Sequence, residues 1–139
     1  MKIYIGYKYK NNKDKEALQN NLEKISNKLQ EICHDCFVLG RDVHGWHINH
    51  ISTSRSVSPI ISNIRKSDLL FAFIDHPGES LGLRFETLCA KVLGKKIILA
   101  VKRNLSEKFF RKLAVKTLEF ENIDDLVAKI PNYFQNLNL

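Results

Sequence analysis

The sequence predicts an α/β fold, a three-layer sandwich in which helices cover both faces of a five-stranded parallel sheet. Two short apolar runs, LLFAFI at 69–74 and IILAV at 97–101, are too brief and too sharply bounded to be buried helices. We interpret them as central strands. Between them, Ser80 can cap a helix that stops at Gly94, and this strand–helix–strand unit makes the two strands parallel.

The segments before this unit continue the same alternation. KIYIG at 2–6 predicts a first strand that ends at Gly6, and apolar residues that recur every three or four positions over 13–32 predict an amphipathic helix. CFVLG at 36–40 predicts the second strand. The polar, Ser-rich stretch at 49–60 is expected to form a loop that closes over a site.

The segments after the loop complete the pattern. Pro59 is expected to begin a helix, a basic helix is expected within 102–115, TLEFE at 117–121 predicts the fifth strand, and 123–137 predicts a closing helix bent near its proline. Five strands then alternate with five helices, without a repeat or a linker. We therefore expect one domain over the whole chain, with a flavodoxin-like or Rossmann-like sheet of order 2-1-3-4-5.

Composition narrows the class of protein. The chain has 139 residues, 44 % of them hydrophobic, and no apolar run near the length that spans a membrane. Its start enters a strand without the features of a signal peptide, so we expect a cytoplasmic protein without a membrane partner. The net charge of +7 suits phosphate-bearing ligands and is equally typical of a lysine-rich surface. No base-reading motif accompanies the charge, so we do not expect nucleic-acid binding.

Cysteine and histidine residues do not favour a metal site. Cys33, Cys36 and Cys89 are an odd number, and we interpret them as reduced thiols rather than as a disulfide framework or a zinc site. Three histidines recur every three residues, namely His44, His47 and His50. Gly45 between them favours a loop, and no carboxylate follows at metal-site spacing. We expect neither a metal nor a cofactor.

Glu86 is the acidic residue of the central helix, about a turn and a half beyond Ser80. The loop before this helix faces the carboxyl edge of the sheet, where ligands bind in open α/β folds. The carboxylate is therefore a candidate for a group that points into the crevice. The alternative is a glutamate in water on the helix surface, as most glutamates are.

Two other loops follow strands at the same edge. After Gly6 come Tyr7, Lys8 and Tyr9, which can hold a phosphate or stack on a base, or can simply form a basic polar loop. Polar and aromatic residues also follow the predicted second strand. The ligand-facing candidates there are Arg41, Asp42, His44, Trp46 and His47.

Taken together, the segments RDVHGW, SDLL, PGESLGLRFE and GKKIILAV resemble the nucleoside 2-deoxyribosyltransferase family. The likeness is to its 2′-deoxynucleoside 5′-monophosphate N-glycosidase branch, and it covers the chain from Ile3 to about Val101. In that family, a helix glutamate closing the motif (S or D)-x-G-x-x-x-E attacks the anomeric carbon of the sugar. Glu86 stands at that position. Ser80 matches the branch in which a serine helps to hold the 5′-phosphate.

The resemblance also implies roles for the other candidates. Ser80 and Gly82 would meet phosphate, Gly6 would border the nucleotide, and Lys8 or Tyr9 would lie beside the base. Asp42 and His44 would approach the base or the sugar, and Asp75 stands at the end of the third strand. Arg84 can pair with Glu86 or with phosphate. A homodimer is implied, in which Ser106 or Arg103 of the neighbouring subunit completes the phosphate site.

Two positions depart from the family pattern. One is Leu88, where relatives usually have glycine two residues after the glutamate. Relatives carry an aspartate eight residues before the position of Asp68, and this chain has Ile60 there. Either Asp42 or Asp75 supplies the second carboxylate, or activity is weak or absent. Asp68 itself is expected to anchor the start of its strand.

The expected function is cleavage of the N-glycosidic bond of nucleosides or nucleoside 5′-monophosphates, by hydrolysis or deoxyribosyl transfer, with a glutamate nucleophile. The expected partner is thus a small molecule. Two alternatives remain open at this point: a non-catalytic nucleotide-binding or sensor protein on the same fold, and a glycohydrolase that acts on a dinucleotide such as NAD.

Overall fold

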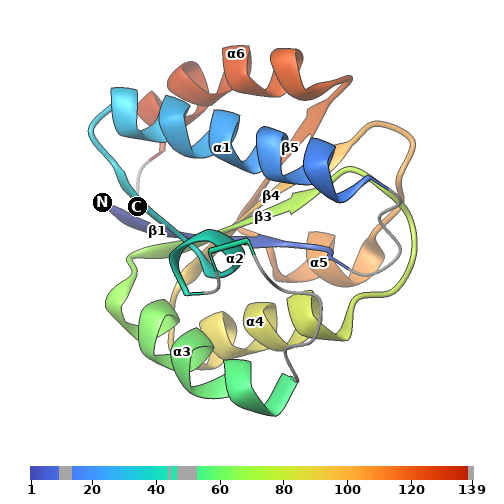
Figure 1. Cartoon of the computed structure of the whole chain (residues 1–139). Coiled ribbons are helices and arrows are strands. Elements are labelled where there is room, and N and C mark those ends of the chain that lie inside the picture. The colour runs from blue at the N-terminus through green and yellow to red at the C-terminus, as the bar shows by residue number, and fades with distance from the viewer. Residues whose placement is uncertain (10–13, 44, 47–52, 138–139) are drawn as a thin grey trace.

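The computed structural model describes residues 1–9, 14–43, 45–46 and 53–137, and its centre is a five-stranded sheet (Figure 1). The strands are β1 (Lys2–Tyr7), β2 (Asp35–Val38), β3 (Leu69–Ile74), β4 (Lys96–Lys102) and β5 (Lys116–Phe120). Their order is β2-β1-β3-β4-β5, and every neighbouring pair is parallel. The predicted fold class and strand order are confirmed.

Helices cover both faces of this sheet. They are α1 (Lys15–Glu31), α2 (Leu39–Asp42), α3 (Thr53–Lys66), α4 (Leu81–Val92), α5 (Lys108–Leu113) and α6 (Ile123–Gln135). Figure 1 shows α1 and α6 on one face and α3, α4 and α5 on the other, and each face has its own apolar core. Within the described ranges, no helix is long and apolar enough to cross a bilayer.

Central strands supply both cores because alternate side chains point to opposite faces. Phe71 and Phe73 of β3 pack toward α1 and α6, and Leu70 and Ala72 pack toward α3 and α4. On β1, Tyr4 belongs to the core beneath α3 and α4. This alternation decides which β1 residues can meet α4.

The local signals around α4 are confirmed. The Ser80 hydroxyl accepts the N–H of Leu83 at 3.2 Å, so Ser80 is the N-cap. Gly94 follows the helix with φ +74°, a left-handed conformation that glycine adopts without strain. The start of the β3 strand is anchored as expected, because the carboxylate of Asp68 accepts the N–H of Lys2 at 2.7 Å.

Two expectations are wrong: the extent of the second strand, predicted at 36–40, and the number of helices, predicted as five. The second strand ends at Val38, and 39–42 form a helical turn that the sequence did not predict, so the described residues contain six helices. Tertiary contacts end the strand: the Asp42 carboxylate accepts the N–H of Val38 at 2.8 Å, and the Tyr7 hydroxyl accepts the N–H of Gly40 at 3.1 Å.

The expected loop over 49–60 is also wrong in part. Helix α3 begins at Thr53 and continues through Pro59, which we expected at its start. Proline has a helical φ and forfeits only its own N–H bond, so a helix can absorb it at a cost. Residues 49–52 lie outside the described residues. Helix α6 likewise includes Pro131.

Candidate active site

Glu86 lies on the side of α4 that faces β1, where its residue is only 8 % exposed. A Cβ atom on Gly6 would lie 3.8 Å from the Glu86 Oε2 atom and 2.8 Å from the Leu83 Cδ1 atom. The second distance is too short for a real contact, so a side chain at position 6 would require the Leu83 side chain to shift. Gly6 thus packs the carboxylate against the carboxyl-terminal half of β1.

Tyr4 lies on the same face of β1, two residues before Gly6, and it is completely buried. Within the described part of the chain, its hydroxyl has no hydrogen-bond partner of standard geometry. It nevertheless lies close enough to the Glu86 carboxylate to affect its ionisation. Sequence reasoning missed Tyr4, although the alternation of residues 4 and 6 along one strand was a usable signal.

Burial raises the pKa of Glu86 to about 8, and the neighbouring Tyr4 hydroxyl offsets part of that increase. Without a ligand, the carboxyl group is therefore mostly protonated at pH 7, and the ionised fraction grows as the pH rises through 8. Burial and the Glu86 charge together raise the pKa of Tyr4 and of Tyr7. A strongly shifted carboxyl group at the ligand-binding edge of a sheet is a recognised mark of a functional site.

Replacing Tyr4 by phenylalanine is expected to raise the pKa of Glu86 further, because the hydroxyl that favours the carboxylate is lost while burial remains. Carbon NMR of the glutamate side-chain carboxyls, titrated from pH 5 to 10 in both proteins, would measure this shift. Tyr133→Phe is the matched control, since Tyr133 also has a buried hydroxyl without a partner among the described residues. A lower pKa of Glu86 in Tyr4→Phe would contradict the assignment.

Lys8 follows β1 and is almost completely buried, with 2 % exposure. Its ammonium group donates to the carbonyl oxygen of Gly78 at 2.6 Å and to Oε1 of Glu107 at 2.5 Å. The sequence placed Lys8 at the site as a substrate contact, and the structure places it at the predicted edge. Glu107, its partner 99 residues away in the chain, was not predicted.

Ser80 and Gly82 lie at the start of α4. The Ser80 hydroxyl already serves as the helix cap, and the residue is 6 % exposed. Gly82 is exposed, and a Cβ atom there would meet nothing within 4 Å. Packing within the chain therefore does not require glycine at this position. A phosphate contact of these two residues stays a prediction.

Comparisons with solved structures bear on the fold. A CMP N-glycosidase from Clostridium botulinum has a TM-score of 0.70 at 18 % identity, covering 96 % of this chain and 100 % of that one. A 2-deoxyribosyltransferase from Bacillus psychrosaccharolyticus has a TM-score of 0.65 at 17 % identity, with 91 % and 90 % covered. A conserved protein from Enterococcus faecalis has a TM-score of 0.66 at 16 % identity, with 96 % and 98 % covered.

The chain has the deoxyribosyltransferase fold. At identities this low the likeness concerns the architecture alone, since one fold can carry many activities. No family model matches the sequence, and no curated protein matches it. The predicted resemblance is therefore supported through structure, and the chemistry must be argued from the residues of the site.

Arg41 and Asp42 form hydrogen bonds with residues of α1 and β2. The guanidinium of Arg41 donates to the Ser26 hydroxyl at 2.8 Å and to the Cys36 carbonyl oxygen at 3.1 Å, and it pairs with Asp42 at 2.9 Å. The same Asp42 carboxylate also accepts the N–H of Val38. These bonds give both residues a structural role, and their contact with a substrate stays a prediction.

Asp75 directly follows β3 at the carboxyl edge, and its Oδ1 atom lies 2.8 Å from Nδ1 of His76. It is the better placed of the two candidates for a second carboxylate. Ile60, at the position of the family's aspartate, is a buried core residue of α3. That position therefore contributes to apolar packing in this chain.

The remaining candidates make other contacts or lie outside the described residues. The Arg84 guanidinium lies 5.1 Å from the centre of the Phe109 ring, and its Nε atom is buried without a partner among the described residues. Tyr9 packs beneath the ammonium group of Lys15, which lies 3.7 Å from the ring centre. Trp46 lies beside Gly40. Of the candidates, His44 and His47 lie outside the described residues.

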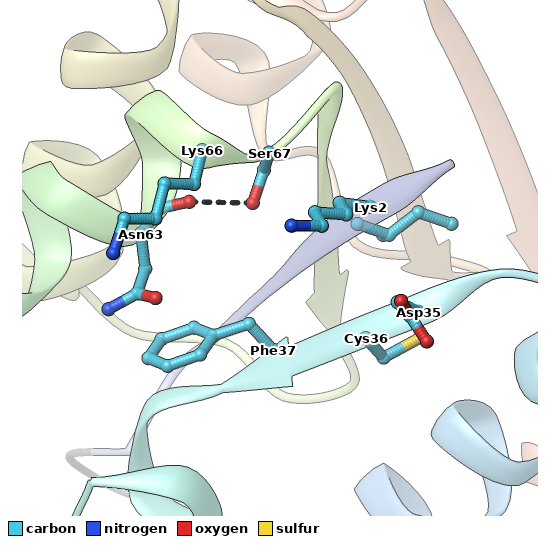
Figure 2. A pocket seen from close by; sticks show the side chains of 8 residues that line it. Lys2, Asp35, Cys36, Phe37, Asn63, Lys66 and Ser67 are labelled. Carbon is cyan, nitrogen blue, oxygen red and sulfur yellow. Dashed lines mark hydrogen bonds between the residues drawn. The ribbon is translucent and has the colours of Figure 1, made fainter.

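Glu86 is not among the residues that line two hollows on the described surface. Figure 2 shows a cavity of about 130 Å³ at the amino-terminal ends of β1 and β2, lined among others by Lys2, Asp35, Asn63 and Lys66. An apolar groove of about 280 Å³ lies between α3 and α4. In the described ranges, no three His, Cys, Asp or Glu residues gather as metal ligands would.

Proposed function

We propose that this protein cleaves the N-glycosidic bond of nucleosides or nucleoside 5′-monophosphates, by hydrolysis or by deoxyribosyl transfer, and that Glu86 is the nucleophile. The observation that carries the proposal is the buried carboxylate of Glu86, held against Gly6 and Tyr4 beside the carboxyl edge of the sheet. Two proteins of the same fold, the CMP N-glycosidase and the 2-deoxyribosyltransferase, support this choice by their activities.

The proposed chemistry uses a carboxylate and a proton donor. The ionised Glu86 forms a bond to the anomeric carbon while the bond from that carbon to the base nitrogen breaks, and the base leaves with the electron pair and takes up a proton. Asp75, alone or through His76, is the candidate donor of that proton. Water or a second base then attacks the same carbon and releases Glu86.

Burial suits this role. A carboxylate that is buried loses part of its stabilisation by water, so its charge is better stabilised by a developing oxocarbenium ion than by solvent. The nearby Tyr4 hydroxyl can hold the carboxylate in place without neutralising it. The raised pKa then means that the active form increases as the solution becomes mildly basic.

A binding protein without turnover is the second candidate. It is favoured by the core position of Ile60 and by the bonds that Asp42 already makes, which leave Asp75 as the remaining candidate for a second acid. This alternative predicts nucleotide binding by calorimetry with no release of base.

A base-release screen tests the proposal. The purified protein is incubated with the common ribonucleosides, deoxyribonucleosides and their 5′-monophosphates, and products are separated by chromatography. We expect free base from at least one of these substrates, and a new nucleoside when a second base is added if transfer occurs. Binding without release from any substrate would establish the second candidate, and neither binding nor release would contradict both.

We also propose that the protein forms a homodimer through α4. The outer face of this helix carries an apolar stripe, Leu81, Phe85, Leu88 and Val92, with spacings of four, three and four residues. Leu81 is 72 % exposed, Leu88 is 46 % exposed and Val92 is 84 % exposed, and the stripe borders the groove against α3. Such spacing is that of a helix–helix seam.

A second copy of the chain fits this α4 stripe in an antiparallel arrangement. Across a two-fold axis, Leu81 would face Val92 and Phe85 would face Leu88. The exposed Glu79 before the amino-terminal end would then lie near Lys91 and Lys95 of the other copy, so charges of opposite sign would meet. The stripe is therefore complementary to itself in shape and in charge.

Leu88→Glu is expected to weaken this dimer by a factor of about 30 or more, because it places a charge in the centre of the seam. Sedimentation velocity over a range of protein concentrations would show the shift to monomer. Val115→Glu is the matched control, since Val115 is 51 % exposed and lies outside the α4 stripe. A wild-type protein that remains monomeric at high micromolar concentration would contradict the interface.

A further inference from the structure

Lys8 occupies a distinctive place on the ligand-binding edge of the sheet. Tyr4, Gly6 and Lys8 alternate along β1 and its extension, so the side chain of Lys8 lies on the same side as the two residues that contact Glu86. It is two residues nearer to the carboxyl edge, where ligands bind in open α/β sheets. Its ammonium group lies 6.0 Å from the Phe110 ring centre. A cation is thus buried at the same edge of the sheet as the proposed reaction site.

The charge of Lys8 is compensated from within the chain. The Glu107 carboxylate lies 2.5 Å from the ammonium group, and the second partner is the Gly78 carbonyl oxygen at 2.6 Å. Gly78 belongs to the segment that leads into Ser80 and α4. Because an uncompensated buried charge is costly, removing one partner of this ion pair alone would destabilise the folded protein. Glu107 occupies one of the three donor positions of the ammonium group, and the Gly78 carbonyl oxygen occupies a second.

The backbone of Glu107 indicates that this contact has a conformational cost. Its φ of +43° lies in the left-handed region, which is uncommon for residues other than glycine. Although Glu107 directly precedes α5, its side chain makes no capping bond to that helix. It extends to Lys8 instead, and the side chain remains 16 % exposed. The β4–α5 loop is thus held in a strained form by a bond that stabilises no helix end.

We propose that Glu107 is an internal counter-ion that disfavours substrates with a phosphate group. A phosphate oxygen within hydrogen-bond distance of Lys8 would lie a few ångströms from the Glu107 carboxylate, and the repulsion of like charges would weaken binding. A neutral nucleoside carries no such penalty. This inference rests on the proposed function, and it makes Glu107 the residue that sets the preference for a nucleoside over its 5′-monophosphate.

The test compares ligand binding by wild type and Glu107→Gln. Glutamine keeps an oxygen that can accept from Lys8, and it removes the negative charge. Isothermal titration calorimetry with cytidine, cytidine 5′-monophosphate and inorganic phosphate measures affinity and does not require turnover. We expect Glu107→Gln to bind the monophosphate about tenfold more tightly relative to the nucleoside, the usual scale for one close charge pair. Inorganic phosphate should show the same gain.

Two further variants separate the effect from a change of net charge or of structure. Glu121→Gln removes one negative charge from an exposed residue that pairs with Arg103 at the other end of the β4–α5 loop, and it should leave the affinity ratio within about twofold. In the double variant Lys8→Met/Glu107→Gln, the gain in monophosphate affinity should disappear, because the cation is absent. Circular dichroism verifies that each variant is folded. If Glu107→Gln is unfolded, Glu107→Asp, whose carboxylate is one methylene shorter, should show a smaller gain of the same sign.

Equal changes in affinity for the nucleoside and the monophosphate would overturn the inference. A gain in monophosphate affinity that persists without Lys8 would also overturn it. Failure of the proposed function gives a different result, because absence of base release leaves the calorimetric comparison intact. A folded Glu107→Gln that binds neither the monophosphate nor inorganic phosphate more tightly than wild type would also overturn it.

Discussion

Glu86→Gln is expected to reduce base release by a factor of about 10³ or more while the protein remains folded. The amide has nearly the shape of the carboxyl group, so packing against Gly6 and Tyr4 is preserved. It cannot attack the anomeric carbon or stabilise positive charge there. Because the proposed reaction depends on this group alone for its nucleophile, the loss should appear in the rate of the chemical step rather than in substrate affinity.

Single-turnover measurements with the substrate identified in the screen would test this expectation, and calorimetry would verify that the variant still binds it. Glu16→Gln is the control, since Glu16 is an exposed glutamate in the first turn of α1, outside the proposed site and the α4 stripe. Retention of more than about a tenth of the wild-type rate in Glu86→Gln would contradict the assignment of Glu86 as the nucleophile. Equal losses in both variants would indicate a general effect on the fold.

Raising the pH from 5 to 9 is expected to destabilise the wild-type protein relative to Glu86→Gln by on the order of 4 kcal/mol. Glu86 has an ordinary pKa of 4.5 and a pKa of about 8 in the folded chain. Between those values, the folded state binds a proton that the unfolded state lacks. Stability from this group is therefore largest in acid and declines as the pH rises toward 8. Glutamine does not titrate, so the variant lacks this dependence.

Urea unfolding of both proteins at several pH values between 5 and 9 would measure the difference in free energy of unfolding. Comparison with the variant cancels the contributions of the other titrating groups that the two proteins share. Glu16→Gln again serves as the control, because the Glu16 side chain is exposed. A difference between wild type and Glu86→Gln that does not change with pH would contradict the buried, proton-binding state of Glu86.

Much of the fold could be predicted because its signals are local. Short apolar runs identified β3 and β4, periodic apolar residues identified α1, and Ser80 and Gly94 marked the ends of α4. The errors arose where contacts between residues far apart in the sequence determine the local structure. The turn at 39–42 depends on the Tyr7 hydroxyl, which lies 33 residues earlier than its partner Gly40, and no local pattern contains that information.

The candidate site was predicted only in part. Glu86 and Gly6 were identified as candidates, and the structure brings them together through the packing of α4 on β1. Tyr4 was overlooked because a tyrosine inside an apolar strand has the same pattern as any core residue. Arg41 and Asp42 were predicted as ligand contacts from their place after a strand. Their bonds to α1 and β2 follow from side-chain geometry that spacing does not encode.

By itself, the sequence determined the alternation of strands and helices, the parallel sheet and the presence of a glutamate on the helix after the central strand. Only the tertiary structure decided the burial and the pKa of that glutamate. Its burial against β1 raises its pKa, and Glu107 compensates the buried charge of Lys8 at the same edge of the sheet. Both depend on contacts between residues far apart in the chain, and the free energy of a charge depends on the groups that surround it in space.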